Sequence, residues 1–257
     1  MNPLIPIIAA ALMLGIVFFF KLFASWGIRW GATPEECARP MTGDAYLAGG
    51  PAARVAMTRA ISIHQPPEVV WPWLAQLGRG AGWYSYDLLD NKGKASARHI
   101  VSWIPEPQPG DATAIGYLRH LEFGRELVWW ANGTKFLGAT ARMVIDLLLT
   151  PQGRGSRLVI RIWADAAGPS ARLAIGVFQV IDTIMARRQL LGLKERVEAY
   201  GARRVDPDHP ENGSPDQYQS FLIIYASGRM AGSHGQEEIS RWRQMAMADK
   251  VIIKSEE

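Results

Sequence analysis

Two polar side chains near the middle of the chain have the types and spacing of an acid–base pair. His120 and Glu122 lie two residues apart in a stretch that we expect to form a strand, so both should share one face. A carboxylate can orient an imidazole that acts as a general base. Leu118 shares that face, and an ordinary solvated surface pair explains the spacing equally well. Asp87 and Arg59 are the other polar residues expected near a cavity, with Asp87 more suited to capping or tying a short helix than to acid–base chemistry.

Aromatic side chains indicate a second kind of chemistry, the binding of an apolar molecule. The chain contains 10 tryptophans. Large aromatic side chains with polar tips line ligand pockets because they combine apolar area with one directed hydrogen bond. Core packing is the competing interpretation for each of them. The residues that we predict to contact a ligand are Trp83, Tyr86, Trp103, His120 and Trp129.

Other kinds of site have little support in the sequence. Cys37 is the only cysteine, so no intrachain disulfide can form, and no histidine has metal-ligand spacing with a second His or Cys. Residues 78–82 (GRGAG) lack the Lys-Ser/Thr and the strand-to-helix context of a phosphate loop. No nucleic-acid-binding motif is present. We therefore expect no metal, no cofactor and no nucleic-acid partner.

The elements that must position these residues follow from hydrophobic periodicity. Apolar residues at three- and four-residue spacing predict a short helix after Pro66-Pro67, and residues 170–200 read as one long helix. Antiparallel strands followed by a long helix indicate an α+β fold. Period-two alternation and apolar runs predict strands at residues 55–63, 114–122, 126–131, 141–150 and 156–164.

A resemblance to a known superfamily is carried by residues 58–91. The matching segments are TRAISI at 58–63, PPE at 66–68 with VWPWL at 70–74, and GWYSYD at 82–87. This combination resembles the START-like (SRPBCC) superfamily, in its polyketide cyclase/dehydrase-like branch. The resemblance implies a helix-grip domain, in which a curved antiparallel sheet wraps around a long carboxyl-terminal helix with a cavity between them. It implies no single reaction, because members bind lipids, carry hydrophobic ligands or process small molecules.

Within that implied fold, strand phase predicts which aromatic residues face the cavity. Leu127 and Trp129 share one face of their strand, while Trp130 points the other way. We therefore predict that Trp129 and Tyr86 point into the space between the sheet and the long helix.

The amino-terminal segment has the composition of a membrane anchor. Residues 3–20 carry no charge and the apolar run extends to Trp26, close to the roughly 20 residues that span a bilayer. No Lys or Arg precedes the run and no small-residue cleavage site follows it, which favours an uncleaved anchor over a signal peptide. Lys21, Arg29 and Arg39 all lie on its carboxyl side. The positive-inside rule then predicts a single-pass protein of the cell membrane with a cytoplasmic domain.

The chain divides by composition, and its charge is unevenly distributed. Residues 201–257 hold 7 Lys/Arg and 9 Asp/Glu, a net charge of −2, and the rest holds 21 against 15, a net charge of +6. Apolar residues on a predicted helix near the carboxyl end suggest docking on a membrane-protein partner or a second copy of the chain. The expected parts are a transmembrane anchor at 3–26, a linker at 27–53, a helix-grip domain at 54–204, a linker at 205–217 and an extension at 218–257.

These observations favour a membrane-anchored, non-enzymatic protein that binds or carries a hydrophobic small molecule or lipid. One alternative is a cyclase/dehydrase-like enzyme acting on a polyketide-like or aromatic substrate. The other is an accessory structural subunit of a membrane complex. A closed, polar-poor cavity would favour carriage, and convergence of His120 and Glu122 would favour catalysis. A filled interior with an apolar exposed tail would favour the subunit.

Overall fold

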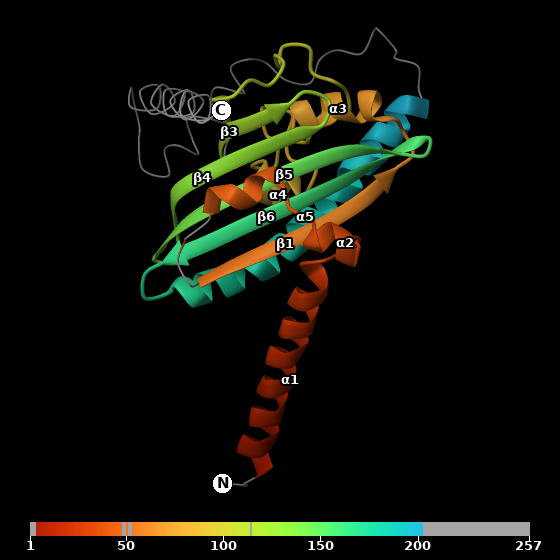
Figure 1. Cartoon of the computed structure of the whole chain (residues 1–257). Helices are drawn as coiled ribbons and strands as arrows, with labels where there is room; N and C mark the ends of the chain where they lie inside the picture. The colour runs from red at the N-terminus through yellow and green to blue at the C-terminus, as the bar shows by residue number, and fades with distance from the viewer. Residues whose placement is uncertain (1–3, 48–49, 51–52, 114, 203–257) are drawn as a thin grey trace.

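An antiparallel sheet forms the centre of the domain. The computed structural model describes residues 4–47, 50, 53–113 and 115–202. Six strands lie in the order β1-β6-β5-β4-β3-β2, so the first and last strands are neighbours (Figure 1). The strands are β1 (Ala53–Ile63), β2 (Ala112–Thr113), β3 (Gly116–Glu122), β4 (Glu126–Phe136), β5 (Ala139–Gln152) and β6 (Gly155–Ala167).

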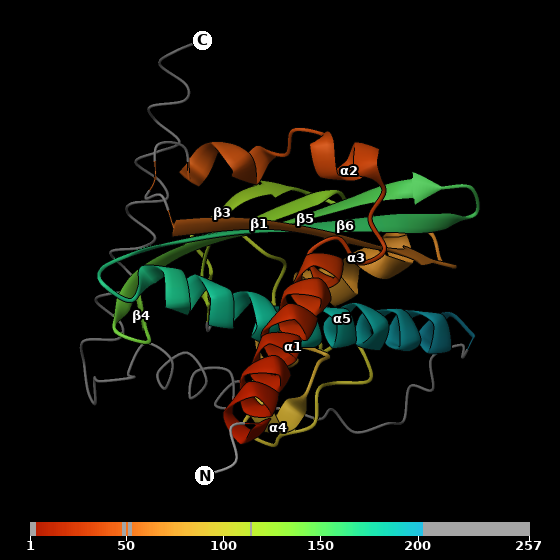
Figure 2. The ribbon, with the colours of Figure 1, turned by 90° about the horizontal axis from the view of Figure 1, so that it is seen from below.

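Helices cover both faces of this sheet. Figure 2 shows the sheet edge-on, with α2 on one side and α5, α4 and α1 on the other. We call these the outer face and the inner face. The helices are α1 (Leu4–Gly27), α2 (Pro34–Ala38), the 3₁₀ helix η1 (Thr42–Leu47), α3 (Pro67–Ala75), α4 (Asp87–Asp90) and α5 (Ala171–Ala202).

The α+β fold expected from the sequence, with an antiparallel sheet and a long carboxyl-terminal helix, is confirmed. The two-residue strand β2 was not predicted, because so short a strand has no periodicity to detect. The extension at 218–257 and the linker at 205–217 lie outside the described residues.

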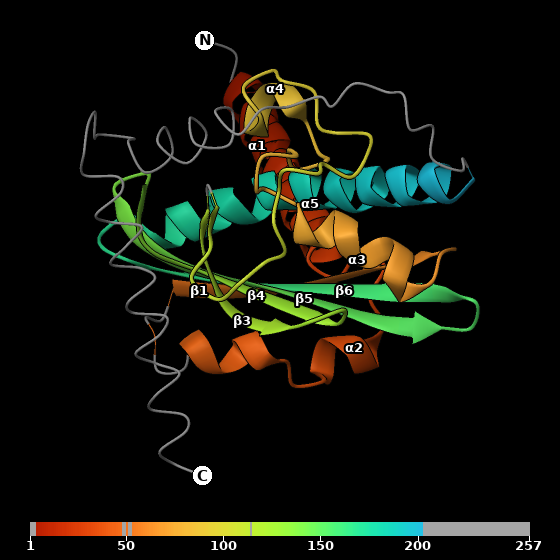
Figure 3. The same ribbon diagram turned by 90° about the horizontal axis from the view of Figure 1, so that it is seen from above.

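The inner face carries the hydrophobic core. Alternate residues of the long strands point toward α5, and α3 closes one end of the core (Figure 3). Trp73 and Tyr84 are fully buried there with Leu127, and the Trp73 ring lies 5.9 Å from that of Tyr84 and 5.7 Å from that of Tyr200. Edge-to-face contacts of this kind add to the stability gained from burying the rings.

Within the segment expected as a linker at 27–53, α2 and η1 pack on the outer face. Thr33 begins α2 with a capping box: its side chain accepts a hydrogen bond from the Glu36 amide at 3.2 Å, and its own amide donates to the Glu36 carboxylate at 2.8 Å. Leu47 of η1 packs with Val128 and Val144 of the sheet. These residues therefore belong to the folded domain rather than only connecting it to α1.

Helix α1 projects away from the domain (Figure 1). Its side chains are almost all exposed, and the stretch Pro6–Gly27 has a mean hydropathy of 2.5. In the described part of the chain, this one helix is long and apolar enough to cross a membrane. A secretory signal sequence meets the same two criteria, so length and composition alone do not distinguish the two.

Candidate functional site

The aromatic residues expected to line a pocket do not surround one. Trp129 is 6% exposed and packs into the core on the inner face, and Trp83 and Trp103 are partly buried against the same core. Trp130 packs on the outer face, as the strand phase predicted. Tyr86 is 42% exposed at the amino-terminal cap of α4, so the prediction that it points into the space beneath the sheet is wrong.

The space between the sheet and α5 is filled by side chains. Trp73, Leu127 and Leu190 occupy it, and each is at most 1% exposed. Two hollows found in the described residues are open surface grooves. One runs along α1, and the other lies between Ala53 of β1 and Arg172 at the start of α5. Neither groove is lined by the predicted ligand-binding residues.

His120 and Glu122 engage different partners. The pairing of β3 with β4 shifts by one residue between Leu118 and His120, and the imidazole Nε2 of His120 lies 3.6 Å from a carboxylate oxygen of Glu126. Glu122 instead forms an exposed ion pair with Arg125, with a nitrogen-to-oxygen distance of 2.8 Å. These contacts do not support the acid–base interpretation of the two residues, because the partner of His120 is Glu126 at the start of β4 and that of Glu122 is Arg125 in the turn before it.

The densest polar cluster in the described residues lies on the outer face and centres on Arg161 of β6. Its guanidinium donates to Thr58 at 3.0 Å and to the Asp44 carboxylate at 2.7 Å. Three further bonds, of 2.8 to 3.0 Å, go to the carbonyl oxygens of Glu36, Cys37 and Arg39. These carbonyls end α2, where no intrahelical donor remains for them. Arg161 therefore both neutralises Asp44 and caps α2.

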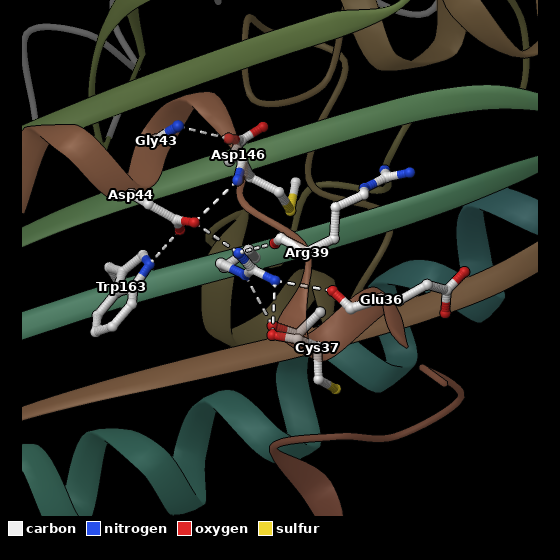
Figure 4. Close-up of polar contacts among 10 residues, drawn as sticks. Glu36, Cys37, Arg39, Gly43, Asp44, Asp146 and Trp163 are labelled. Atoms are coloured by element: carbon white, nitrogen blue, oxygen red, sulfur yellow. Dashed lines mark hydrogen bonds and ion pairs between the residues drawn. The ribbon is translucent and has the colours of Figure 1, made fainter. Parts of the chain in front are cut away.

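Asp44 connects this cluster to η1. Its carboxylate accepts hydrogen bonds from the Met41 amide at 2.9 Å and from the Trp163 indole at 2.6 Å (Figure 4). A second ion pair lies beside it, where Arg157 holds both oxygens of Glu36 at 2.7 and 2.8 Å. The hydrogen bond from Arg157 lowers the pKa of Glu36. Together these bonds fix α2 and η1 on strand β6.

A buried pair of carboxyl groups completes the cluster. Asp146 is 1% exposed and accepts a hydrogen bond from the amide of Gly43 at 2.7 Å (Figure 4). Glu126 is 6% exposed and accepts the hydroxyl of Thr42 at 2.9 Å. Burial, followed by the neighbouring charges of Glu126 and Asp44, raises the pKa of Asp146 to about 7. Burial and the neighbouring carboxylates therefore favour the protonated form of Asp146.

Asp146, Glu126 and His120 have the chemical types needed for proton transfer, but Asp146 and Glu126 are buried where Gly43 and Thr42 of η1 contact them, and His120 is partly exposed. A methyl group on Gly43 would lie 2.8 Å from Val144, which leaves no room for a substrate beside Asp146. Within the described residues, no group of three or more His, Cys, Asp or Glu side chains is arranged to hold a metal ion. The arrangement best suits a structural role, in which the polar groups hold η1 against the sheet.

Arg59 and Asp87 also act as structural residues. Arg59 is 1% exposed and reaches the end of α1, donating to the Gly27 carbonyl at 2.6 Å and to Asp182 of α5 at 2.6 Å. Burial raises the pKa of Asp182, while the Arg59 charge lowers it. Asp87 accepts hydrogen bonds from the amide and the hydroxyl of Ser96, which fixes the loop after α4. This agrees with the structural role expected for Asp87.

Sequence reasoning missed Asp146, Glu126, Arg161 and Asp44 as members of one cluster. The alternation in β5 and β6 placed Asp146 and Arg161 on the polar face of the sheet. It gave no sign that another segment covers this face. The only local signal was the capping box at Thr33, which indicated a helix in the segment that forms the cover.

Comparison with known proteins gave distant structural likenesses. No family model and no curated protein sequence matches the chain. A protein from Mesorhizobium loti matches with 18% identity and a TM-score of 0.35, over 57% of this chain and 98% of that one. A protein from Nitrosomonas europaea matches with 14% identity and a TM-score of 0.36, over 60% and 99%. An AHSA1-like protein from Rhizobium etli matches with 15% identity and a TM-score of 0.33, over 63% and 92%.

Proposed function

We propose that this chain is a membrane-anchored, non-enzymatic module that acts through its surface, as an accessory subunit of a membrane complex. The observation that carries the proposal is the filled interior. A carrier of the START-like kind needs space between sheet and helix, and here Trp73, Tyr84 and Leu127 occupy that space. The residues left for contact with other molecules are those on the surface.

The anchor supports the location at a membrane. Helix α1 is apolar and exposed, and burying it in a bilayer removes that surface from water. Lys21 and Arg29 are exposed at its carboxyl-terminal side, which supports a cytoplasmic domain. The partner would be a membrane protein or a second copy, reached through the extension at 218–257.

The dispersal of the candidate catalytic groups supports a non-enzymatic role. His120 contacts Glu126, Glu122 contacts Arg125, and neither pair faces a hollow among those found in the described residues. A cyclase/dehydrase-like reaction would need polar groups converging on a bound substrate.

Binding of a hydrophobic small molecule or lipid is a second candidate, supported by one specific observation. The indole nitrogen of Trp73 is buried in the core without a hydrogen-bond acceptor. A buried donor without a partner costs stability, and an acceptor atom on a ligand would satisfy it. Such a ligand would have to displace core side chains to enter.

Native mass spectrometry of the full-length protein, released from detergent, separates these two functions. For the subunit we expect the mass of the bare chain, of a dimer, or of a complex with a protein partner. A hydrophobic molecule retained at one per chain would overturn the subunit proposal. Trp73→Phe, which removes only the indole donor and some ring area, should then reduce retention, while Trp163→Phe on the outer face is the matched control.

The topology is tested separately on the same protein. We expect the intact mass to include the amino-terminal residues, and we expect protease to reach the domain only from the cytoplasmic side. A mature chain that begins after Ser25 would contradict the anchor.

A further inference from the structure

Exposed apolar side chains outside α1 are concentrated on the side of the domain from which α1 projects. Figure 2 shows α4 and α5 on the same side of the sheet as α1, and Figure 3 shows the same arrangement from the opposite direction. The turn between β4 and β5 joins them, because the Ser170 hydroxyl before α5 donates to the Leu137 carbonyl at 2.7 Å. The exposed fractions are 81% for Leu88, 72% for Leu89, 49% for Leu137, 63% for Leu173, 47% for Ile181 and 45% for Ile184. We call these six residues the interfacial surface.

The end of α1 is fixed beside this surface. Arg59 binds the Gly27 carbonyl, and Gly27 lies so close to Thr183 of α5 that an added Cβ atom would overlap the Thr183 side chain. Beyond α1, the amide of Ala60 donates to the Trp30 carbonyl at 3.1 Å, and the Arg187 guanidinium lies 5.3 Å from the centre of the Trp30 ring. These contacts fix the end of α1 next to α5. A bilayer that surrounds α1 must therefore also lie close to α5.

The charges of α5 change along its length in a way that suits a membrane. In the first half the exposed residues are apolar, glycine or arginine, and Asp182, the one carboxylate among residues 171–187, is turned inward to Arg59. In the second half, half-buried charges pair with one another, as Lys194 does with Glu198. Apolar side chains with flanking basic residues, here Arg172 and Arg187, are typical of helices that lie in a membrane interface.

Basic residues are also exposed on elements next to the interfacial surface. Lys21 of α1 and Lys92 and Lys94 after α4 are exposed. Cations at this position are attracted to anionic lipid headgroups. A protein partner would also cover apolar residues, but the continuity with an apolar helix of spanning length favours lipid as the occupant.

We propose that the interfacial surface lies in the headgroup region of the bilayer that holds α1, and that the bilayer contains anionic lipid. The first half of α5 then lies against the membrane, and its second half extends into water with α3. This inference rests on the proposed anchoring of α1 and adds a second membrane contact to it. The domain would be held in one orientation at the membrane rather than swinging on its anchor.

Nitroxide labels on the full-length protein test this orientation. Cys37→Ser provides a background without cysteine, and its backbone carbonyl, which binds Arg161, is unaffected. Single cysteines replace Leu88, Leu173 or Ile181, and the protein is placed in vesicles of phosphatidylcholine with phosphatidylglycerol. Phe123→Cys is the matched control, because Phe123 is also apolar and 68% exposed but lies at the turn between β3 and β4. Met13→Cys reports on α1.

The readout is the accessibility of each label to oxygen, which concentrates in lipid, relative to a water-soluble nickel complex. We expect a higher ratio at positions 88, 173 and 181 than at 123. A high ratio at 13 with water-like ratios at 88, 173 and 181 would overturn the second contact and leave the anchor standing. A water-like ratio at 13 would overturn the anchor itself. Labels at 88, 173 and 181 shielded from both reagents would show a protein cover, which also overturns the inference.

Discussion

The two faces of the sheet are covered by different physical means. On the inner face, α5 and α3 pack through apolar side chains such as Trp73, Leu118 and Leu127, all fully buried. On the outer face, α2 and η1 are held by charged groups, chiefly Arg161 and Asp44. Apolar packing is non-directional and tolerates rearrangement, whereas charged hydrogen bonds require particular partners.

The two faces therefore contribute differently: one mainly stabilises the domain, and the other mainly positions α2 and η1. The inner face removes most of the apolar surface from water and so supplies most of the stability. The outer face has smaller apolar clusters, and there Arg161 joins α2 and Asp44 through directed hydrogen bonds. We therefore expect substitutions on the inner face to lower stability and substitutions on the outer face to release α2 and η1.

Trp129→Ala should have the largest effect. Removing this buried ring leaves a cavity and should lower the free energy of unfolding by about 3–5 kcal/mol, as for other core tryptophans. Denaturant unfolding of the full-length protein in detergent measures this loss. If stability is unchanged and only retention of a small molecule falls, Trp129 lines a pocket and the comparison between the two faces fails.

Arg161→Met should cost somewhat less, about 3 kcal/mol, because Asp44 keeps its bonds from Met41 and Trp163. The change leaves Asp44 without its cation and three carbonyls without a donor. Hydrogen exchange should rise in residues 34–47 while the core stays protected. The double variant R161M/D44N should recover part of the loss. If Arg161→Met leaves the free energy of unfolding and the exchange of residues 34–47 unchanged, apolar packing alone holds these residues.

Asp146→Asn should make stability less dependent on pH. The pKa of Asp146 is raised in the folded protein from 3.8 to about 7, so folding favours the protonated acid. Stability contributed by that acid is present below about pH 4 and declines as the pH rises toward 7. An amide mimics the protonated state, so the melting temperature at pH 8 should rise by about 2–4 °C, with little change at pH 4. An equal change at both pH values would contradict the assigned titration.

Glu122→Gln should have the smallest effect, within about 0.5 kcal/mol of the wild-type stability. Its ion pair with Arg125 is exposed, and such pairs contribute little in water. Thermal unfolding of the variant measures this. A loss comparable to that of Arg161→Met would mean that the exposed end of β3 shares the energetics of the buried cluster.

Local pattern was sufficient to predict most of the fold. The alternation of Ile160 and Ile162 with Arg161 identifies a strand with one apolar face, and it assigns Arg161 to the opposite face. It could not show that Arg161 is buried, because the covering segment lies more than 110 residues earlier in the chain. Charged residues at alternating positions look the same whether water or another segment covers them.

The candidate site was harder to predict than the fold for the same reason. The interpretation of His120 and Glu122 considered only their own strand, but each side chain contacts a residue that lies after that strand in the sequence. A one-residue shift in pairing between β3 and β4 has no signature in single-residue patterns. The size and apolar character of the aromatic residues are the same in a pocket lining and in a packed core, so the sequence could not distinguish the two.

The pairing of β1 with β6 has a consequence for synthesis of the protein. Arg59 and Asp182 are separated by 123 residues, so the contact that fixes the end of α1 forms only after most of the domain has left the ribosome. If α1 enters the membrane first, β1 lies next to the bilayer without a partner strand until β6 has been synthesised. Unpaired strand edges favour aggregation. The nascent domain is therefore most exposed to aggregation between the synthesis of β1 and that of β6.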